Sequence, residues 1–219
     1  LKREMKKMSK LEDFEKAANI RDQILTLEKI LAHAKIFEIE SFKEINWQKI
    51  QRTLQQILKT KQEISRIEAY DISNIQGKEA TGSMVTFTRG SPDKDYYRRF
   101  KIKISGKPND IAMLKEVLSR RFKHPEWPYP DLILIDGGIA QLNAALKVKR
   151  QKAKGKNIKL ISLAKKENKL FVENQKKPIL LETLPREIFN LILQLRDEAH
   201  RFALVYHKKL REKAFIRRE

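Results

Sequence analysis

The sequence contains no cysteine, which excludes disulfide bonds, thiolate nucleophiles and zinc sites built on sulfur. It also has no run of about 18 apolar residues, the length that a membrane-spanning helix requires. The first residues form no apolar leader segment. We therefore expect a cytoplasmic chain with no membrane partner.

Acidic residues are scarce relative to basic ones. The chain has 48 Lys and Arg against 28 Asp and Glu, which gives a net charge of +20 at pH 7. A charge of this size indicates a polyanionic partner, with a lysine-rich solvated surface as the alternative. Residues 1–66 carry 15 basic and 10 acidic side chains, whereas residues 67–219 carry 33 and 18. The polyanion-binding face is therefore expected in the second part.

Glycine and proline are absent from residues 1–66, where apolar residues recur at spacings of three and four. This pattern predicts amphipathic helices. A break near Ser9 and Asp13 predicts a helical hairpin over residues 1–36. Its apolar stripe is too thin for a domain of its own, so it either packs on this chain or docks on another protein. Residues 37–66 are expected to be a helical linker, with a helix over 46–64.

The period changes after Ser65. The segments RIEAYDIS, SMVTFTRG and YYRRFKIKI alternate apolar and polar residues and predict an antiparallel meander. Further elements are expected as a helix over 109–122, a buried parallel strand over 131–136, a helix after Gly138, a strand over 158–163, a small hairpin over LFVEN and a helix over 185–214. The order predicts an α/β class, a ribonuclease-H-like mixed sheet with flanking helices over residues 67–219, preceded by the N-terminal helical hairpin.

Two aspartates stand where apolar strands end: Asp71 in the first strand, and Asp136 just before Gly137-Gly138. A charge there is costly unless it is paired, hydrated or bound to a cation. One such aspartate is commonly a helix cap or turn residue, but two in one sheet favour a metal site. Oxygen ligands with at most one imidazole suit Mg²⁺ or Mn²⁺. Beside a basic surface, such an ion favours phosphodiester cleavage. Nucleotide-binding signatures are absent, and no small-molecule cofactor is expected.

The predicted last helix and several basic pairs supply further candidates. Asp197 and His200 lie three residues apart, which fits a metal ligand with its orienting partner, a general base with its carboxylate, or only a surface pair. Basic side chains grip phosphates without reading base sequence. The candidates for this role are Arg98, Arg99, Arg120, Arg121, Lys165, Lys166, Arg201, Lys208, Lys209 and Arg211.

The motifs IEAYDISNIQG, DLILIDGGIAQLNAA and LQLRDEAHRFALVYHKKLREK resemble, in this order, the UvrC family of bacterial nucleotide-excision-repair nucleases. The resemblance implies a metal-dependent endonuclease domain of ribonuclease-H-like fold that makes the 5′ incision in damaged double-stranded DNA. It implies metal ligands at Asp71, Asp136 and His200. Asp110 is implied as a further catalytic residue, where the family's acidic pair reads Asn109-Asp110.

The segment LEDFEKAANIRDQI is similar to the UVR hairpin of this family, which implies that residues 1–36 contact the partner protein UvrB. Its candidate contact residues are Phe14, Arg21, Ile24 and Leu27. The family's GIY-YIG and helix-hairpin-helix domains are missing and the first residue is Leu1, so we expect a piece of a longer polypeptide. The alternative function is a non-catalytic nucleic-acid-binding module, but the coincidence of two aspartates and a histidine favours the nuclease.

Overall fold

The computed structural model describes residues 47–73, 80–104 and 109–216, together with 18–24 and positions 5, 8, 9, 13 and 16. The chain forms two compact units, Leu1–Gln48 and Lys49–Glu219. In the first unit, residues 18–24 are helical, and Asp13 accepts hydrogen bonds from Lys16. Arg21 is exposed in this helix and Ile24 is half-buried. The other predicted partner contacts, Phe14 and Leu27, lie outside the described residues.

The second unit is built on one mixed sheet, in which eight strands fall among the described residues. These are β1 (Arg66–Ser73), β2 (Thr81–Thr88), β3 (Ser91–Pro92), β4 (Arg98–Lys101), β5 (Leu132–Asp136), β6 (Lys159–Ala164), β7 (Lys169–Val172) and β8 (Ile179–Leu180). The order across the sheet is β3-β2-β1-β5-β6-β7-β8, and β4 also pairs with β2. β1, β5 and β6 are mutually parallel, whereas the other pairs are antiparallel.

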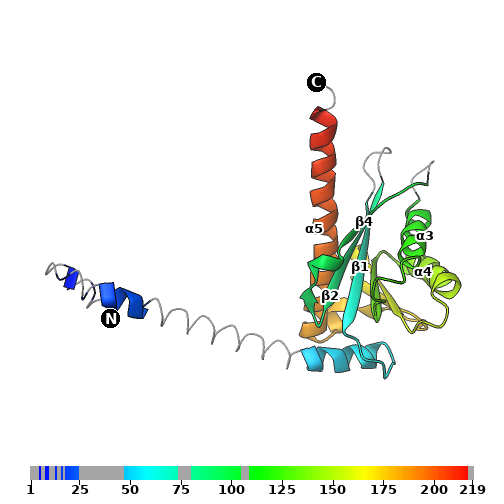
Figure 1. Cartoon of the computed structure of the whole chain (residues 1–219). Coiled ribbons are helices and arrows are strands. Elements are labelled where there is room, and N and C mark those ends of the chain that lie inside the picture. Colours follow the sequence, from blue (N-terminus) through cyan, green and yellow to red (C-terminus); the bar gives the residue numbers. More distant parts are fainter. Residues whose placement is uncertain are drawn as a thin grey trace. The chain divides into compact units, whose positions relative to one another are not determined.

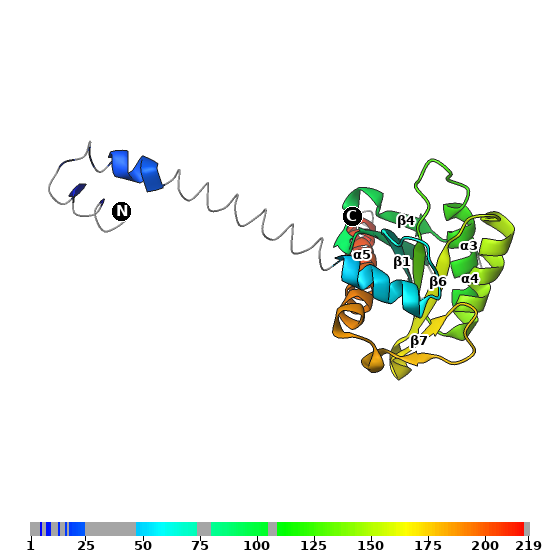
Figure 2. The ribbon, with the colours of Figure 1, turned by 90° about the horizontal axis from the view of Figure 1, so that it is seen from below.

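Helices cover both faces of this sheet (Figures 1 and 2). α3 (Asp110–Arg121) and α4 (Ile139–Lys152) lie on one face, and α5 (Arg186–Ile216) lies on the other. Because side chains alternate along a strand, Tyr70 and Ile135 enter the core beneath α3 and α4, while Ala69 and Leu134 face α5. Burial of a side chain such as Leu134 or Ile135 stabilises the fold by about 1.5–3 kcal/mol, so the ends of the central strands are held firmly.

The predicted fold class is confirmed, and three element boundaries are corrected. The helix expected over 46–64 covers 47–57 among the described residues, since Lys59 adopts a left-handed conformation with φ 49° and ends it. The strand expected over YYRRFKIKI is β4 and begins only at Arg98, because a 3₁₀ turn forms over Lys94–Tyr96. The segment LFVEN contributes the end of β7, which pairs with both β6 and β8.

Residues 49–66 pack with the sheet as part of one unit. The Lys49 ammonium pairs with Glu187 at 2.5 Å, and Gln175 donates to the carbonyl of Ile57 at 2.7 Å. The carboxylate of Asp131 accepts from the backbone amides of Ser65 and Arg66, which fixes the start of β1. None of the helices in the described part of the chain is long and apolar enough to cross a membrane.

Candidate active site

The strand register places Asp71 beside Asp136. β1 and β5 are parallel and pair Ala69 with Leu134 and Tyr70 with Ile135, so one further step along both strands brings the two aspartates together. Neighbouring strands lie about 4.8 Å apart, and both aspartates share the face of Ala69 and Leu134, toward α5. The Asp71 side chain is 6% exposed and the Asp136 side chain 16%. The structure thus gathers two carboxylates at the carboxyl edge of the parallel strands.

Lys165 joins this pair from the end of the next parallel strand, β6. Its Nζ lies 2.5 Å from Oδ2 of Asp136. Burial raises the pKa of Asp136 above its usual value of 3.8, and the neighbouring Asp71 carboxylate raises it further, although the Lys165 ammonium acts in the opposite direction. The net upward shift means that one ammonium does not fully offset the cost of burying this negative charge. Two carboxylates with too little positive charge beside them fit a hard divalent cation, which binds through oxygen ligands.

His200 reaches the pair from α5. Its Nδ1 lies 3.7 Å from Oδ1 of Asp71, and half of the side chain is exposed. Ser83 on β2 links α5 to the end of β1. Its hydroxyl donates to the carbonyl of Ala199 at 3.0 Å and lies 3.3 Å from the carbonyl of Asp71. The sequence carried no motif that would reveal Ser83. Asp197 does not orient His200; it pairs with Arg196 at 2.6 Å and is largely exposed.

The predicted set of metal ligands is only partly assembled. Within the part of the chain that the structure describes, no group of three or more His, Cys, Asp or Glu residues is arranged to hold a metal ion. Asp110 is exposed in the first turn of α3, whose N-terminus is capped by Asn109 accepting from Ala112 at 3.1 Å. α3 packs on the opposite face of the sheet from α5, and an acid in the first turn of a helix also interacts favourably with the helix dipole. The catalytic role of Asp110 stays a prediction.

A small cavity beneath the carboxylates brings in Arg196, which the sequence reasoning missed. Asp136, Arg196 and Ala199 line it together with apolar residues of the three parallel strands. Arg196 stands four residues before His200 on α5, so both project from the same side of the helix. This spacing within the motif RDEAH was a usable signal.

Gly137 and Gly138 let the chain turn from β5 into α4 directly behind Asp136. Gly137 has φ +153°, and a Cβ there would meet the Gln141 side chain at 2.7 Å. The Gly137 amide donates to Leu163, and the Gly138 amide donates to Oε1 of Gln141 at 3.0 Å. The glycine pair therefore fixes where the strand ends and where its carboxylate points.

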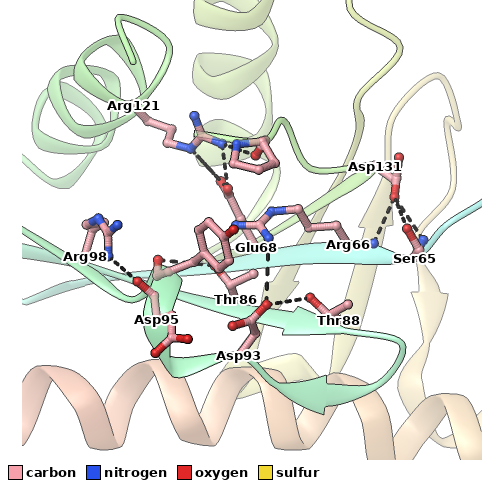
Figure 3. Close-up of polar contacts among 12 residues, drawn as sticks. Ser65, Arg66, Glu68, Thr86, Thr88, Asp93, Asp95, Arg98, Arg121 and Asp131 are labelled. Atoms are coloured by element: carbon pink, nitrogen blue, oxygen red, sulfur yellow. Dashed lines mark hydrogen bonds and ion pairs between the residues drawn. The ribbon is translucent and has the colours of Figure 1, made fainter. Parts of the chain in front are cut away.

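The predicted phosphate contact at Arg121 is wrong in this structure. Its side chain is completely buried and pairs with the equally buried Glu68 at 2.8 Å (Figure 3). Arg98 and Arg120 are half-buried and donate to backbone carbonyls of Tyr97 and Lys101. The side chains of four further candidates lie outside the described residues: Lys166, Lys208, Lys209 and Arg211.

Arg99, Lys165 and Arg201 are the candidates that remain exposed. Arg99 lies level with Asp71 across the sheet. Asp71 on β1 pairs with Ser83 on β2, and Ser83 pairs in turn with Arg99 on β4. Two strand spacings put Arg99 about 10 Å from Asp71. Its guanidinium lies over the Phe202 ring at 4.1 Å. Arg201 forms a two-point ion pair with Glu198 at 2.6 Å.

The raised pKa of Asp136 predicts that Asp136→Asn stabilises the metal-free chain at neutral pH. The folded-state pKa lies above the ordinary value of 3.8, so the ionised group costs stability as the pH rises through the folded pKa, and the cost vanishes below 3.8. We expect the variant to melt a few degrees higher at pH 7 in EDTA, at about 2–4 °C per kcal/mol, with the gain shrinking toward pH 4.

Differential scanning calorimetry across this pH range measures the effect. Asp131→Asn is the matched control, because Asp131 accepts from two backbone amides and its loss should lower the melting temperature. An Asp136→Asn variant that melts lower than the wild type at pH 7 would show that the ion pair with Lys165 outweighs burial and repulsion.

These features define a ribonuclease-H-like α/β domain whose parallel strands bring an acidic pair to one edge, beside a histidine and a lysine. The family described as the UvrC RNAse H endonuclease domain matches residues 55–204, and the UvrB/uvrC motif UVR matches residues 1–30. The chain therefore belongs to the UvrC family, and the resemblance drawn from its motifs is confirmed.

Curated relatives agree with this assignment. The UvrABC system protein C of Dictyoglomus thermophilum is 47% identical over 194 residues, which cover 86% of this chain and 32% of that protein. The protein of the same name from Geotalea daltonii is 43% identical over 161 residues, or 67% of this chain and 26% of that protein. That of Fusobacterium nucleatum is 38% identical over 185 residues, with 83% and 31% covered. The chain thus spans between about a quarter and a third of the length of these relatives.

Proposed function

We propose that this chain is the part of a nucleotide-excision-repair nuclease that hydrolyses a DNA phosphodiester bond on the 5′ side of a lesion, with Mg²⁺ or Mn²⁺. The observation that carries the proposal is the largely buried pair of Asp71 and Asp136 at one sheet edge, within a chain of net charge +20. Membership in the family described as an endonuclease domain supports it.

The two aspartates are the residues that would hold the divalent ion, and His200 beside Asp71 is the third candidate ligand. When bound, such an ion activates water for attack and neutralises charge on the scissile phosphate. Because the Asp71 and Asp136 side chains are largely buried, their carboxylates are held in place by the strands rather than by flexible loops. The Lys165 ammonium lowers the pKa of Asp136 and so opposes the upward shift caused by burial, which favours the ionised form that the ligand role needs.

Cations around the pair would hold the DNA. Arg99, about 10 Å from Asp71 across two strands, suits a neighbouring phosphate of the same backbone. Arg196 lines the cavity beside Asp136 and suits the phosphate that is cut, once it leaves its weak, exposed partner Asp197. Such contacts position the backbone and read no base sequence.

The test is incision of a 5′-labelled duplex of about 50 base pairs that carries one lesion and is preloaded with UvrB. We expect a cut on the 5′ side of the lesion with Mg²⁺ or Mn²⁺, none in EDTA, and none with Ca²⁺ in place of Mg²⁺, because Ca²⁺ takes a looser ligand geometry. Tight DNA binding without incision under any metal would instead support the non-catalytic binding module.

The N-terminal unit is proposed to dock on UvrB. The UVR match over residues 1–30 supports this role, as does the half-buried position of Ile24 on the helix over 18–24, beside the exposed Arg21. In the same assay, Ile24→Asp should lower incision of UvrB-loaded DNA while leaving the melting temperature of the second unit unchanged. The exposed Asn19→Asp on the same helix is the control for added charge.

A further inference from the structure

One strongly basic segment takes no part in the site described above. Residues 147–159 read KVKRQKAKGKNIK, with seven Lys and Arg and no Asp or Glu. They cover the end of α4, the turn at Gly155 and the first residue of β6. Five of the cations are exposed, and we call them the basic segment: Lys147, Arg150, Lys152, Lys154 and Lys156.

The remaining two cations anchor the backbone that carries this segment. Lys149 and Lys159 pair with the same carboxylate, the buried Glu173, at 3.0 and 3.7 Å. This pairing joins the end of α4, the start of β6 and the turn after β7. The five exposed cations form no ion pair with a carboxylate of residues 47–73, 80–104 or 109–205. The segment therefore presents several uncompensated positive charges on an anchored backbone.

The composition of this surface selects the kind of partner. The exposed large hydrophobic residues among the described side chains lie elsewhere in the sequence, at Ile104, Ile139, Leu180, Leu204 and Val205. A stable protein interface needs an apolar centre, and a helix lying in a membrane surface needs an apolar face. A row of cations without either is complementary to the phosphate backbone of a nucleic acid.

The fold also sets the distance of this surface from the aspartate pair. α4 starts just after Asp136 and runs for 14 residues, Ile139–Lys152. At about 1.5 Å per residue the helix is about 21 Å long, so its basic end lies at the opposite edge of the sheet. The helix lies on the face of the sheet opposite α5, so the basic segment and the aspartate pair lie on different faces as well as at different edges.

We propose that the basic segment is a second DNA-backbone contact, separate from the contacts around the aspartate pair. It holds the duplex flanking the incision and reads no base sequence. Its position in the DNA flanking the incision rests on the proposed function, because it takes the aspartate pair as the point of cutting. Binding of duplex DNA by the segment does not depend on cutting.

The test uses the full chain and a fluorescein-labelled, lesion-free duplex of 30 base pairs, with affinity measured from 50 to 200 mM salt. The variant carries Lys147→Gln, Arg150→Gln, Lys154→Gln and Lys156→Gln. The control removes four exposed cations from other elements, with Arg52→Gln, Lys61→Gln, Lys94→Gln and Arg186→Gln. Each lost phosphate contact reduces the slope of log affinity against log salt by about 0.9, so we expect a loss of about 2–4 in slope and about tenfold or more in affinity.

Equal losses in the variant and the control would overturn the proposal, because net charge alone would then explain binding. An unchanged variant would overturn it as well, and so would loss of binding to phosphatidylserine vesicles with unchanged DNA affinity. The proposed function fails separately: a wild-type chain that shows the steep salt slope but never incises UvrB-loaded DNA would keep this contact and refute the nuclease.

Discussion

Arg121→Ala should unfold the domain under conditions that the wild type easily tolerates. The guanidinium donates to Glu68 through Nε at 3.0 Å and through Nη2 at 2.8 Å, and to the carbonyl of Pro128 at 2.7 Å. Tyr70 donates to the other Glu68 oxygen at 2.6 Å. Arg121 and Glu68 are both 0% exposed. Removing the arginine leaves a buried carboxylate without its countercharge, which costs about 3–5 kcal/mol, against a total stability of about 5–15 kcal/mol.

Urea unfolding followed by circular dichroism measures this loss. Arg120→Ala is the matched control. The Arg120 side chain is 33% exposed and pairs with Glu116 on the same helix, so its removal should lower the free energy of unfolding by no more than about 1 kcal/mol. Replacing both partners, as Glu68→Gln with Arg121→Met, should recover much of the stability. Equal losses for the two single arginine variants would show that the buried pair does not stabilise the fold.

The contrast between Arg120 and Arg121 shows what the sequence could and could not reveal. Treating them as one basic pair was wrong, because successive residues on a helix point about 100° apart. The signal for burial was present: Leu114, Val117 and Leu118 form the buried side of α3, and Arg121 continues it at the next turn. Its partner Glu68 is far away in the chain, so no local pattern could identify the ion pair.

The sequence predicted where the strands end better than it predicted which side chains meet at the site. LILID reads as a buried strand because its apolar run is continuous and stops at Asp136, and the structure places β5 over Leu132–Asp136. The meeting of Asp71 and Asp136 depends on strand pairing between segments more than 60 residues apart, which local periodicity does not fix. Likewise, the approach of His200 depends on how α5 docks on β2 through Ser83.

Asp71→Asn and Asp136→Asn should each lower the rate of incision by about 1,000-fold or more. A carboxylate that holds a divalent ion contributes several kcal/mol to stabilising the transition state, and each 1.4 kcal/mol corresponds to about tenfold in rate. An amide keeps the shape of the side chain, so the fold should survive; for Asp136 the raised pKa further implies that removing the charge does not destabilise the fold. His200→Ala should lose about 100- to 10,000-fold, as expected for a proton-handling group or a third ligand.

Single-turnover incision of UvrB-loaded, lesion-bearing DNA by Asp136→Asn tests the central claim most directly. The same preparation must bind the 30-base-pair duplex within a few fold of the wild type and melt no lower than it at pH 7, so that lost activity reports the site alone. We predict no measurable cut on the 5′ side of the lesion with either Mg²⁺ or Mn²⁺. A variant that binds, folds and still cuts at a rate near that of the wild type would show that the acidic pair is not the catalytic centre of this protein.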